Sequence, residues 1–202
     1  MSRRENMGKI FYIMGKSASG KDKIYGYLSE NQELALKKLI LYTTRPIRAE
    51  EENGKQYYFV DEKKYKEFKK AGTLIEARTY KTVHGLWTYF TADDGQVELD
   101  KGDYLGIGTL ESYKKMKKYY GEEALCPVYI EVEDGERLER ALLREKKQKK
   151  PKYAELCRRF LADLEDFSEE NIKDAGITCR FQNVDLDVCI EEIVNYIKTM
   201  QS

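Results

Sequence analysis

The sequence has one histidine, no paired cysteine motif and no long apolar run. The single histidine, His84, excludes a metal site built from several histidines. A Ser-His-Asp triad would have to use it, and no G-x-S-x-G motif supports one. Apolar runs stay well short of the ~18 residues that a membrane-spanning helix needs, and the first residues lack the apolar stretch of a secretion signal. We therefore expect a cytoplasmic protein without zinc and without a membrane partner.

An excess of either charge is also absent, since Lys+Arg and Asp+Glu both number 36. A nucleic-acid-binding domain usually carries a cationic surplus, so no nucleic-acid partner is expected. The lysine-rich segment 146–152 is then predicted to be a solvated tip. Cys126, Cys157, Cys179 and Cys189 have neither disulfide-like nor metal-ligand spacing and are expected to be reduced.

What the sequence does contain is a glycine-rich segment directly after the apolar run 10–14. It reads Gly15-Lys16-Ser17-Ala18-Ser19-Gly20-Lys21-Asp22. A strand, a glycine-rich turn and a helix start are typical of the phosphate-binding loop G-x-x-x-x-G-K-[ST]. The glycines allow backbone amides to point at phosphate oxygens, and Lys21 and the helix N-terminus add positive charge. The segment is therefore predicted to bind ATP.

Asp22 departs from this motif, because a hydroxyl that ligates Mg²⁺ normally stands there. A carboxylate is a good ligand for a hard cation, so Asp22 is predicted to hold Mg²⁺ directly or through water. It would also bring negative charge near the phosphates, which costs binding unless the metal neutralises it. An inactive loop would more naturally lose Lys21 or a glycine, and both are present, so we expect a working phosphate-binding loop.

Apolar runs alternate with helix-like stretches, which predicts a parallel sheet covered by helices. The predicted strands are 9–14, 39–44, 56–60, 73–77, 87–90, 104–108, 126–130 and 180–183. The predicted helices are 22–30, 62–70 with Asp61 as its N-cap, 110–119, helical segments from Glu136 onward, and 185–200. Asn53-Gly54 is a strong turn signal.

Further motifs follow the loop in a fixed order. They are Thr43-Thr44-Arg45-Pro46-Ile47-Arg48, Asn53-Gly54-Lys55-Gln56-Tyr57-Tyr58-Phe59-Val60, Ala71-Gly72-Thr73-Leu74-Ile75-Glu76, Val83-His84-Gly85, Lys101-Gly102, an arginine-rich segment and Asn183. This series resembles the guanylate kinase family over roughly residues 8 to 200. The resemblance implies an ATP- and Mg²⁺-dependent nucleoside monophosphate kinase, which converts GMP or dGMP to the diphosphate.

The resemblance also implies the architecture. We expect one P-loop α/β domain over residues 1–202, with three layers and a parallel sheet. Its core would comprise 8–40, 103–136 and 161–200. A small mixed-β insertion at about 41–102 would bind the acceptor, and 137–160 would form a helical lid.

The family's site residues carry over one by one. Arg45 and Arg48 match arginines that grip the acceptor phosphate, a task that suits guanidinium forks, and Arg45 is also expected to serve catalysis. Tyr57 matches a tyrosine that donates to the same phosphate. Glu76 matches a glutamate that accepts hydrogen bonds from guanine N1–H and its amino group. Trp87 or Tyr89 would stack on the acceptor or hydrogen-bond to it.

Phosphoryl transfer needs positioning and charge neutralisation rather than a general base, because the attacking phosphate oxygen is already anionic. Lys21 and arginines of a mobile lid would supply that charge. Among the lid arginines 137, 140, 144, 158 and 159, Arg144 and Arg159 fit the family pattern best. Asn183 is expected to help bind the nucleotide.

Two positions depart from the family. Leu41 and Gly108 stand where a serine and an aspartate help to read the base, and neither offers a polar group. Tyr42 and Thr109, one residue away, are candidate substitutes. The departures weaken strict guanine specificity, because a hydrogen-bonding site discriminates through its bonds.

Two alternatives to a guanylate kinase therefore stay open. One is a related kinase of another phosphate ester, such as ribose 1,5-bisphosphate. The other is a silent guanylate-kinase-like domain that binds a phosphorylated peptide. A monomer or a homodimer is expected.

Overall fold

The structure is a computed structural model that describes residues 7–82 and 85–202. Val83 and His84, which belong to the predicted motif series, lie outside the described residues. Within those two ranges, no helix combines the length and the apolar character needed to cross a membrane.

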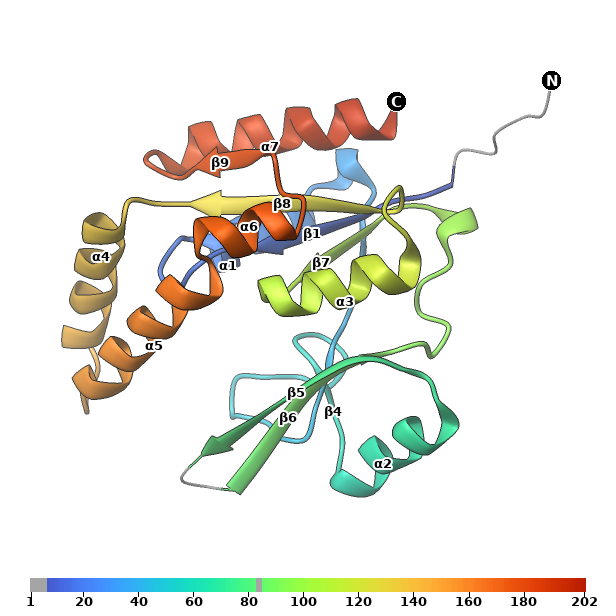
Figure 1. Cartoon of the computed structure of the whole chain (residues 1–202), viewed down its shortest axis with the longest axis horizontal. Helices are drawn as coiled ribbons and strands as arrows, with labels where there is room; N and C mark the ends of the chain where they lie inside the picture. The colour runs from blue at the N-terminus through green and yellow to red at the C-terminus, as the bar shows by residue number, and fades with distance from the viewer. Residues whose placement is uncertain (1–6, 83–84) are drawn as a thin grey trace.

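The core is a five-stranded parallel sheet in the order β2-β7-β1-β8-β9 (Figure 1). Its strands are β1 Ile10–Met14, β2 Lys37–Lys38, β7 Tyr104–Ile107, β8 Leu125–Glu131 and β9 Arg180–Gln182. All five residues of β1 are buried, as expected for the central strand of a parallel sheet covered on both faces.

Helices form the outer two layers. They are α1 Lys21–Glu30, α3 Leu110–Tyr120, α6 Glu169–Asp174 and α7 Leu186–Gln201, with short 3-10 segments at Gln32–Leu34 and Leu99–Lys101. Phe11 and Ile13 of β1 pack with α1 and α7, whereas Ile10, Tyr12 and Met14 pack with α3 and α6. Successive side chains of a strand point to opposite faces, so one short strand joins both halves of the core. The predicted three-layer fold is confirmed.

A second, mixed sheet lies below the core in the view of Figure 1, in the order β4-β3-β6-β5. Its strands are β3 Tyr42–Thr43, β4 Tyr58–Phe59, β5 Leu74–Thr82 and β6 Gly85–Ala92. β3 and β4 are parallel, and β6 is antiparallel to both β3 and β5. Helix α2 Glu62–Ala71 packs against one face through a small aromatic core. Its cap Asp61 accepts a hydrogen bond from the amide of Lys64 at 2.7 Å, as predicted.

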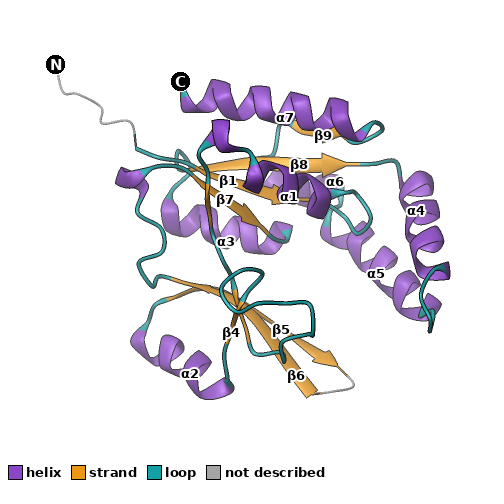
Figure 2. Ribbon diagram, turned by 180° about the vertical axis from the view of Figure 1, so that it is seen from behind, coloured by secondary structure: helices purple, strands orange, loops and turns teal. Residues whose placement is uncertain are grey.

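Two helices project from one end of the core sheet, side by side in Figures 1 and 2. They are α4 Asp134–Lys146 and α5 Tyr153–Asp166. The exposed lysine-rich segment between them is the predicted solvated tip. The predicted lid at 137–160 falls within this helical pair.

The single strand predicted at 39–44 is wrong. Lys37 and Lys38 pair with β7 in the core sheet, whereas Tyr42 and Thr43 pair with β4 and β6 in the second sheet. Leu39 and Leu41, which made this run look like one strand, are both buried in the core. The apolar run that looked like one strand is therefore the segment in which the chain crosses from the core sheet to the second sheet. In addition, β5 and β6 extend beyond the short strands predicted there, and α6 was not predicted as a separate helix.

Candidate active site

The glycine-rich segment forms a tight turn between β1 and α1. Gly20 has φ 88°, in the left-handed region that favours glycine. A Cβ on Gly15 would lie 2.5 Å from the carbonyl oxygen of Ile130, and one on Gly20 would lie 2.2 Å from Nδ2 of Asn183. Both motif glycines are therefore required by close approach of the surrounding chain.

Asn183 supports this turn from beneath. Its side chain is buried, and Nδ2 donates to the carbonyl oxygen of Ser19 at 2.7 Å. Arg140 in turn donates to the carbonyl oxygen of Asn183 at 2.9 Å. Asn183 was predicted to bind nucleotide. In the structure it braces the loop that the nucleotide is expected to contact.

Lys21 and Asp22 begin helix α1 beside the turn. Lys21 Nζ lies 3.9 Å from Asp22 Oδ2, and the Asp22 side chain is 81% exposed. No cluster of three or more His, Cys, Asp or Glu that could hold a metal occurs within 7–82 and 85–202. A single exposed carboxylate suits Mg²⁺, which is usually bound by one or two carboxylates together with substrate phosphates. The residues fit a cation that arrives with a nucleotide.

The lid helices are tied to the loop through a buried arginine. Arg137 is 1% exposed and donates to Asp134, to Asp163 and to the carbonyl oxygen of Ser17. Asp163 also accepts from the amide of Ser17 at 2.7 Å, and Lys16 pairs with Asp134 at 3.1 Å. The role of Asp163 was not predicted, because no local pattern relates a residue of α5 to a loop 146 residues earlier.

The two arginines predicted to be catalytic differ in exposure. Arg144 is exposed near the end of α4. Arg159 is half-buried, and its Nε, 3.8 Å from Glu155 Oε1, is buried without a hydrogen-bond partner in the described chain. Neither has a hydrogen bond to the phosphate-binding loop in the described chain. Arg158 pairs with Glu155, and this hydrogen bond chiefly raises the pKa of Arg158, with a smaller contribution from Tyr80 of β5.

Arg45 is buried beside the second sheet, and its two terminal nitrogens are hydrogen-bonded to a carboxylate. Nη1 and Nη2 donate to the two carboxylate oxygens of Glu51 at 2.7 and 2.5 Å, and Nη1 also donates to the Pro46 carbonyl oxygen. The guanidinium packs over the rings of Tyr57 and Phe59. Nε, by contrast, is buried without a partner. Nε is thus the donor of Arg45 that remains for a ligand.

Glu51 was not among the predicted site residues. The hydrogen bond with Arg45 chiefly lowers the pKa of Glu51, to about 2, so its carboxylate is ionised at neutral pH. That same bond is the largest cause that raises the pKa of Arg45, and the Tyr89 hydroxyl adds to it. The available signal was a glutamate three residues after Arg48, where its carboxylate accepts from the Arg48 amide and closes a turn.

The predicted acceptor residues Tyr57 and Tyr89 lie beside Arg45. Their ring centroids are 5.5 Å apart. Burial chiefly raises the pKa of Tyr57; the Tyr89 charge also raises it, Arg45 and Arg78 lower it, and Asp22 raises it. Tyr57 thus lies beside Arg45 and Tyr89 on the second sheet. The Arg48 side chain is exposed on the same loop.

Glu76 is fully buried and paired with an arginine that was not predicted. Arg78 Nε donates to Glu76 Oε2 at 3.0 Å, and Nη2 donates to Oε1 at 3.4 Å. Thr91 donates to Oε1 at 3.1 Å. Arg78 Nη1 reaches Thr109 at 3.1 Å. Residues two apart on a strand share a face, so the spacing of Glu76 and Arg78 was a usable signal.

The cross-strand register places the aromatic candidates on this same face. Tyr89 lies opposite Arg78, and Trp87 lies opposite Tyr80. Trp87 is half-buried. The face of the second sheet that turns away from α2 therefore carries Glu76, Arg78 and the aromatic residues together.

Leu41 and Gly108 contribute no polar group, as predicted. A Cβ on Gly108 would lie 2.1 Å from Tyr12 Oη, and one on Gly106 would lie 2.8 Å from Tyr12 Cδ2. The Tyr12 hydroxyl is within hydrogen-bond distance of Ser112 Oγ at 2.8 Å. Gly106 of β7 and Gly108 just after it thus make room for the buried ring of Tyr12.

Tyr42 and Thr109, the residues proposed to replace the missing base-reading groups, lie in different places. Tyr42 packs against Phe68 and Phe90 in the aromatic core under α2, and its hydroxyl donates to Asp94. The idea that Tyr42 reads the acceptor is therefore wrong. Thr109 caps α3 and holds Arg78, so it does lie beside the candidate site.

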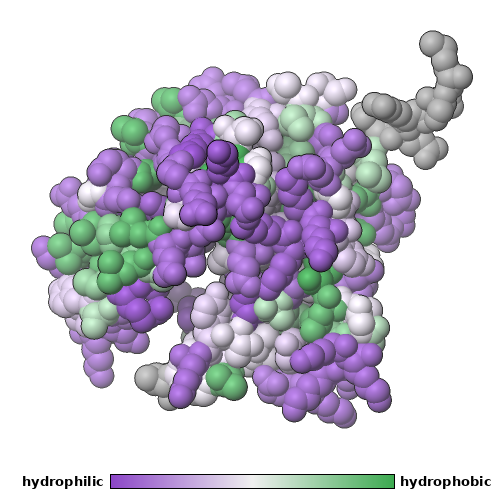
Figure 3. Space-filling view, viewed as in Figure 1, coloured by the Kyte–Doolittle hydropathy of each residue, from purple (hydrophilic) through white to green (hydrophobic). Residues whose placement is uncertain are grey.

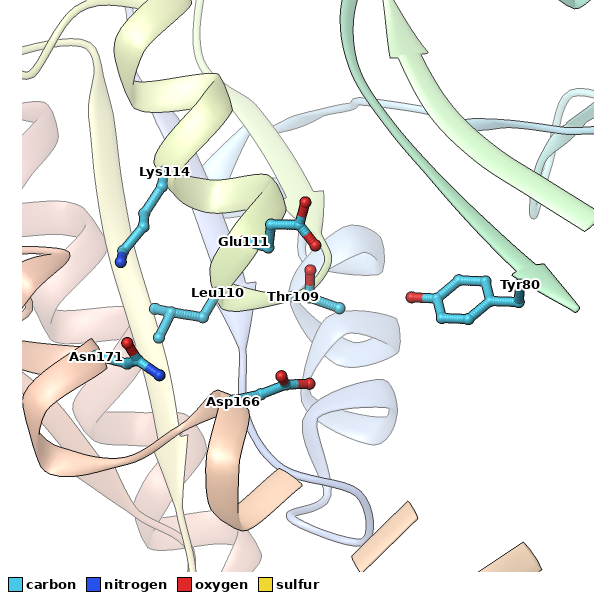
Figure 4. Close-up of a pocket in the computed structure, with 7 residues that line it drawn as sticks. All are labelled: Tyr80, Thr109, Leu110, Glu111, Lys114, Asp166 and Asn171. Atoms are coloured by element: carbon cyan, nitrogen blue, oxygen red, sulfur yellow. The ribbon is translucent and has the colours of Figure 1, made fainter. Parts of the chain in front are cut away.

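Open space adjoins these residues. Figure 3 shows the molecule hollowed between the lid helices and the second sheet. A cavity of about 240 Å³ opens between β5, the start of α3 and the end of α5. In Figure 4 the side chains of Thr109, Glu111, Asp166 and Tyr80 surround this space, with Tyr80 across from the other three.

A glycine-rich loop between a buried strand and a helix, a buried arginine on a second sheet and a projecting helical pair together form the arrangement expected of a P-loop kinase. The sequence matches the family model described as "Guanylate kinase" over residues 7–198, and the chain belongs to the guanylate kinase family. The chain is 28% identical to the guanylate kinase of Porphyromonas gingivalis over 190 residues, covering 93% of this chain and 95% of that protein.

Two further relatives agree. A guanylate kinase of Wolbachia pipientis is 30% identical over 190 residues, covering 92% of this chain and 87% of its own length. The crystal structure of guanylate kinase from Anaplasma phagocytophilum has a TM-score of 0.63 at 21% identity, covering 96% of this chain and 87% of that one. The structural likeness supports the fold, and the sequence matches support the family.

Proposed function

We propose that this chain transfers the γ-phosphoryl group of ATP to GMP or dGMP, giving ADP and the nucleoside diphosphate. Its family membership and its relatives named guanylate kinase support this proposal. The observation that carries it is Arg45, whose Nε is buried without a hydrogen-bond partner in the described chain and whose guanidinium packs over the ring of Tyr57. A buried guanidinium with an unused donor is suited to an anion such as the acceptor phosphate.

The donor nucleotide would be held by backbone. Amides of residues 15–20 and the N-terminus of α1 would contact the phosphates, and Lys21 would neutralise the β and γ groups. Mg²⁺, held by Asp22 and phosphate oxygens, would screen the charge that develops on the transferring group. Asn183 and Arg137 would keep the loop in its binding shape through the bonds described above.

The acceptor phosphate would be held by side chains. The free Nε–H of Arg45 suits a charge-assisted hydrogen bond to a phosphate oxygen. The hydroxyls of Tyr57 and Tyr89 would donate to the same phosphate, and the exposed Arg48 would close over it. Arg144 and Arg159 would approach when the lid closes, with Arg158 as a third candidate because its charge interacts with the second sheet. The attacking oxygen needs no base.

The test is an ADP-release assay with ATP, Mg²⁺ and GMP. Lys21→Ala should lower turnover at least ~1,000-fold, because it removes the fixed charge nearest the transferring phosphate. Lys23→Ala, on an exposed residue of the same helix, is the matched control and should be unchanged. Asp22→Ser should retain activity, because a hydroxyl also binds Mg²⁺. Turnover that does not depend on Lys21 would contradict the assignment.

A second candidate acceptor is another phosphate ester, such as ribose 1,5-bisphosphate. The apolar Leu41 and the missing side chain of Gly108 favour it, since base-reading groups are absent there. A panel of nucleoside and sugar monophosphates separates the two, and silence throughout would favour the non-catalytic, peptide-binding alternative. A cytoplasmic location and a monomeric or dimeric state complete the proposal.

A further inference from the structure

An apolar surface lies on the two projecting helices. Five large apolar side chains are between 36% and 64% exposed there, namely Leu138 and Leu142 of α4 and Tyr153, Leu161 and Leu164 of α5. Figure 3 shows hydrophobic side chains gathered in one area over α4 and α5. Single exposed apolar side chains need no explanation, whereas a contiguous patch is typical of a contact surface. We call these five residues the lid patch.

The members of the lid patch lie on the same side of the helical pair. α4 and α5 run antiparallel, and the guanidinium carbon of Arg137 lies 4.3 Å from the ring centroid of Phe160 where they touch. Leu138 follows Arg137 by one position, and Leu161 follows Phe160 by one. Neighbours in a helix are ~100° apart, so in an antiparallel pair these equal turns lead to the same side. The other members lie one or two helical turns along the same faces.

The contacts between the helical pair and the glycine-rich loop lie on other faces. Arg137 and Asp163 both bond to the backbone of Ser17. Each of them precedes a member of the lid patch by one position, so it points to a neighbouring face of its helix. A partner bound to the lid patch would therefore leave these contacts to the loop in place.

Charge is distributed unevenly along the helical pair. In the half nearer the core, Glu139 and Glu165 are exposed. At the tip, the lysines at 146, 147, 149, 150 and 152 are exposed. Within residues 7–82 and 85–202, neither glutamate is ion-paired, and the same is true of these lysines. The unpaired charges beside the lid patch are thus negative at one end of the helical pair and positive at the other.

We propose that the lid patch binds a second copy of this chain, with the two helical pairs side by side and antiparallel. A patch that meets its own copy forms a twofold symmetric interface, in which every contact occurs twice. The antiparallel arrangement brings the lysines of each tip to the acidic half of the partner, whereas a parallel arrangement would place like charges together. This dimer goes beyond the proposed function and does not depend on it.

Analytical ultracentrifugation of the full chain provides the first test. Between about 1 μM and 1 mM, the range of weak protein–protein affinities, we expect the mass to rise from the 23.7 kDa of one chain toward twice that value. Sedimentation equilibrium gives the dissociation constant of the dimer. A chain that stays monomeric over this whole range would overturn the inference.

Leu161→Ser assigns the interface to the lid patch, because Leu161 is its most exposed member and its loss leaves no cavity in the core. The dissociation constant of the dimer should rise at least ~10-fold, as expected for a central apolar contact. Leu143→Ser is the matched control, because Leu143 is 51% exposed on another face of α4, and it should leave the dissociation constant unchanged. Equal effects of the two substitutions, or none for Leu161→Ser, would overturn the assignment.

Charge reversal tests the orientation of the two copies. Lys146→Glu/Lys149→Glu makes the tip acidic, and Glu139→Lys/Glu165→Lys makes the half nearer the core basic. Each double variant alone should dimerise at least ~10-fold more weakly than the wild-type protein, because like charges then meet. An equimolar mixture should regain the wild-type dissociation constant within about threefold, since each tip again meets the opposite charge. A mixture as weak as the separate variants, or separate variants as strong as the wild-type protein, would overturn the antiparallel dimer.

Discussion

One half of the candidate site consists mainly of backbone groups, and the other half consists of side chains. In the core sheet, the phosphate loop is made of glycines and backbone amides between β1 and α1, and close approach of Ile130 and Asn183 determines its shape. In the second sheet, the acceptor side is made of side chains on β5, β6 and the loop after β3, including Arg45, Arg78 and Tyr89. Backbone chemistry is the same for every residue type, whereas side-chain chemistry changes with each substitution.

This difference explains where the chain departs from its family. The loop keeps both motif glycines and Lys21, although Asp22 differs. Beside the second sheet, Leu41 and Gly108 offer no polar side chain, whereas Glu76 and Arg78 form a buried ion pair on that sheet. A site made of side chains can exchange one set of donors and acceptors for another while the strands that carry them stay in register. Substrate preference can therefore change without any change in the donor site.

The largest expected effect that tests this difference between the two halves of the site is that of replacing Arg45. Arg45→Met should lower kcat/KM for the acceptor by about 100- to 1,000-fold, because truncating one partner of a buried, hydrogen-bonded charge contact costs roughly 2–5 kcal/mol. KM for ATP should change little, since the donor site is separate. Steady-state kinetics with each substrate varied in turn provide the measurement.

Arg48→Met is the control for Arg45, because Arg48 lies on the same loop with an exposed side chain. Its effect should be about tenfold, as expected for an exposed charge. The Arg45→Met/Glu51→Gln double variant tests whether an unpaired Glu51 carboxylate accounts for the loss. Equal and small losses for Arg45→Met and Arg48→Met would refute the buried fork as the phosphate grip.

Much of the core could be predicted from the sequence alone, for a local reason. The strand at 10–14, the glycines, Lys21 and the helix that follows are adjacent in the chain, so one short pattern reports all of them. Helix α2 could also be predicted, because Asp61 and Gly72 mark its ends. The prediction of one strand over 39–44 failed. Leu39 and Leu41 lie where the chain crosses from one sheet to the other, and an apolar pattern does not show which sheet a residue joins.

The rest of the site depends on contacts that no local pattern reports. Asp163, for example, reaches Ser17 from a distant helix. Two of the missed residues did have a local signal: Arg78 follows Glu76 by two on the same strand, and Glu51 follows Arg48 by three within a turn. The buried ring of Tyr12, which excludes a side chain at Gly108, could not be inferred without the register of β1 on β7.

A smaller effect, on stability, is expected for glycine substitutions in the half of the molecule that contains the core sheet. Gly108→Ala should destabilise the protein by about 1–3 kcal/mol, because its Cβ would meet Tyr12 Oη at 2.1 Å and overpack the site. Gly26→Ala, on α1 where a Cβ meets nothing within 4 Å, should instead stabilise by about 0.5–1 kcal/mol. Urea unfolding measures both.

Tyr12 should account for the Gly108 penalty. In a Tyr12→Leu background, Gly108→Ala should cost clearly less than it does alone, so that the double-mutant cycle shows coupling of about 0.5–3 kcal/mol. Additive effects would mean that Tyr12 does not occupy the space beside Gly108, and that the loss of a polar group there has another cause.

A small effect is also expected for Glu51, which accepts from Nη1 and Nη2 of Arg45. Glu51→Gln should raise KM for the acceptor by about tenfold, or ~1.4 kcal/mol, with kcat little changed, because the fork is less firmly positioned. Glu52→Gln, beside it on the exposed surface, should change neither constant. A lower KM for Glu51→Gln would mean that Glu51 competes with the acceptor phosphate and does not position Arg45.

The pH dependence of stability gives Glu51 a second readout. Its pKa lies at about 2, below the ordinary 4.5, so the folded state favours the ionised carboxylate. The contribution of the pair to stability is therefore complete above about pH 4.5 and is lost as the pH falls toward 2. The difference in unfolding free energy between the wild-type protein and Glu51→Gln should be constant above about pH 5 and shrink below it. A difference that stays constant down to pH 2 would show that the carboxylate is not ion-paired with Arg45 in solution.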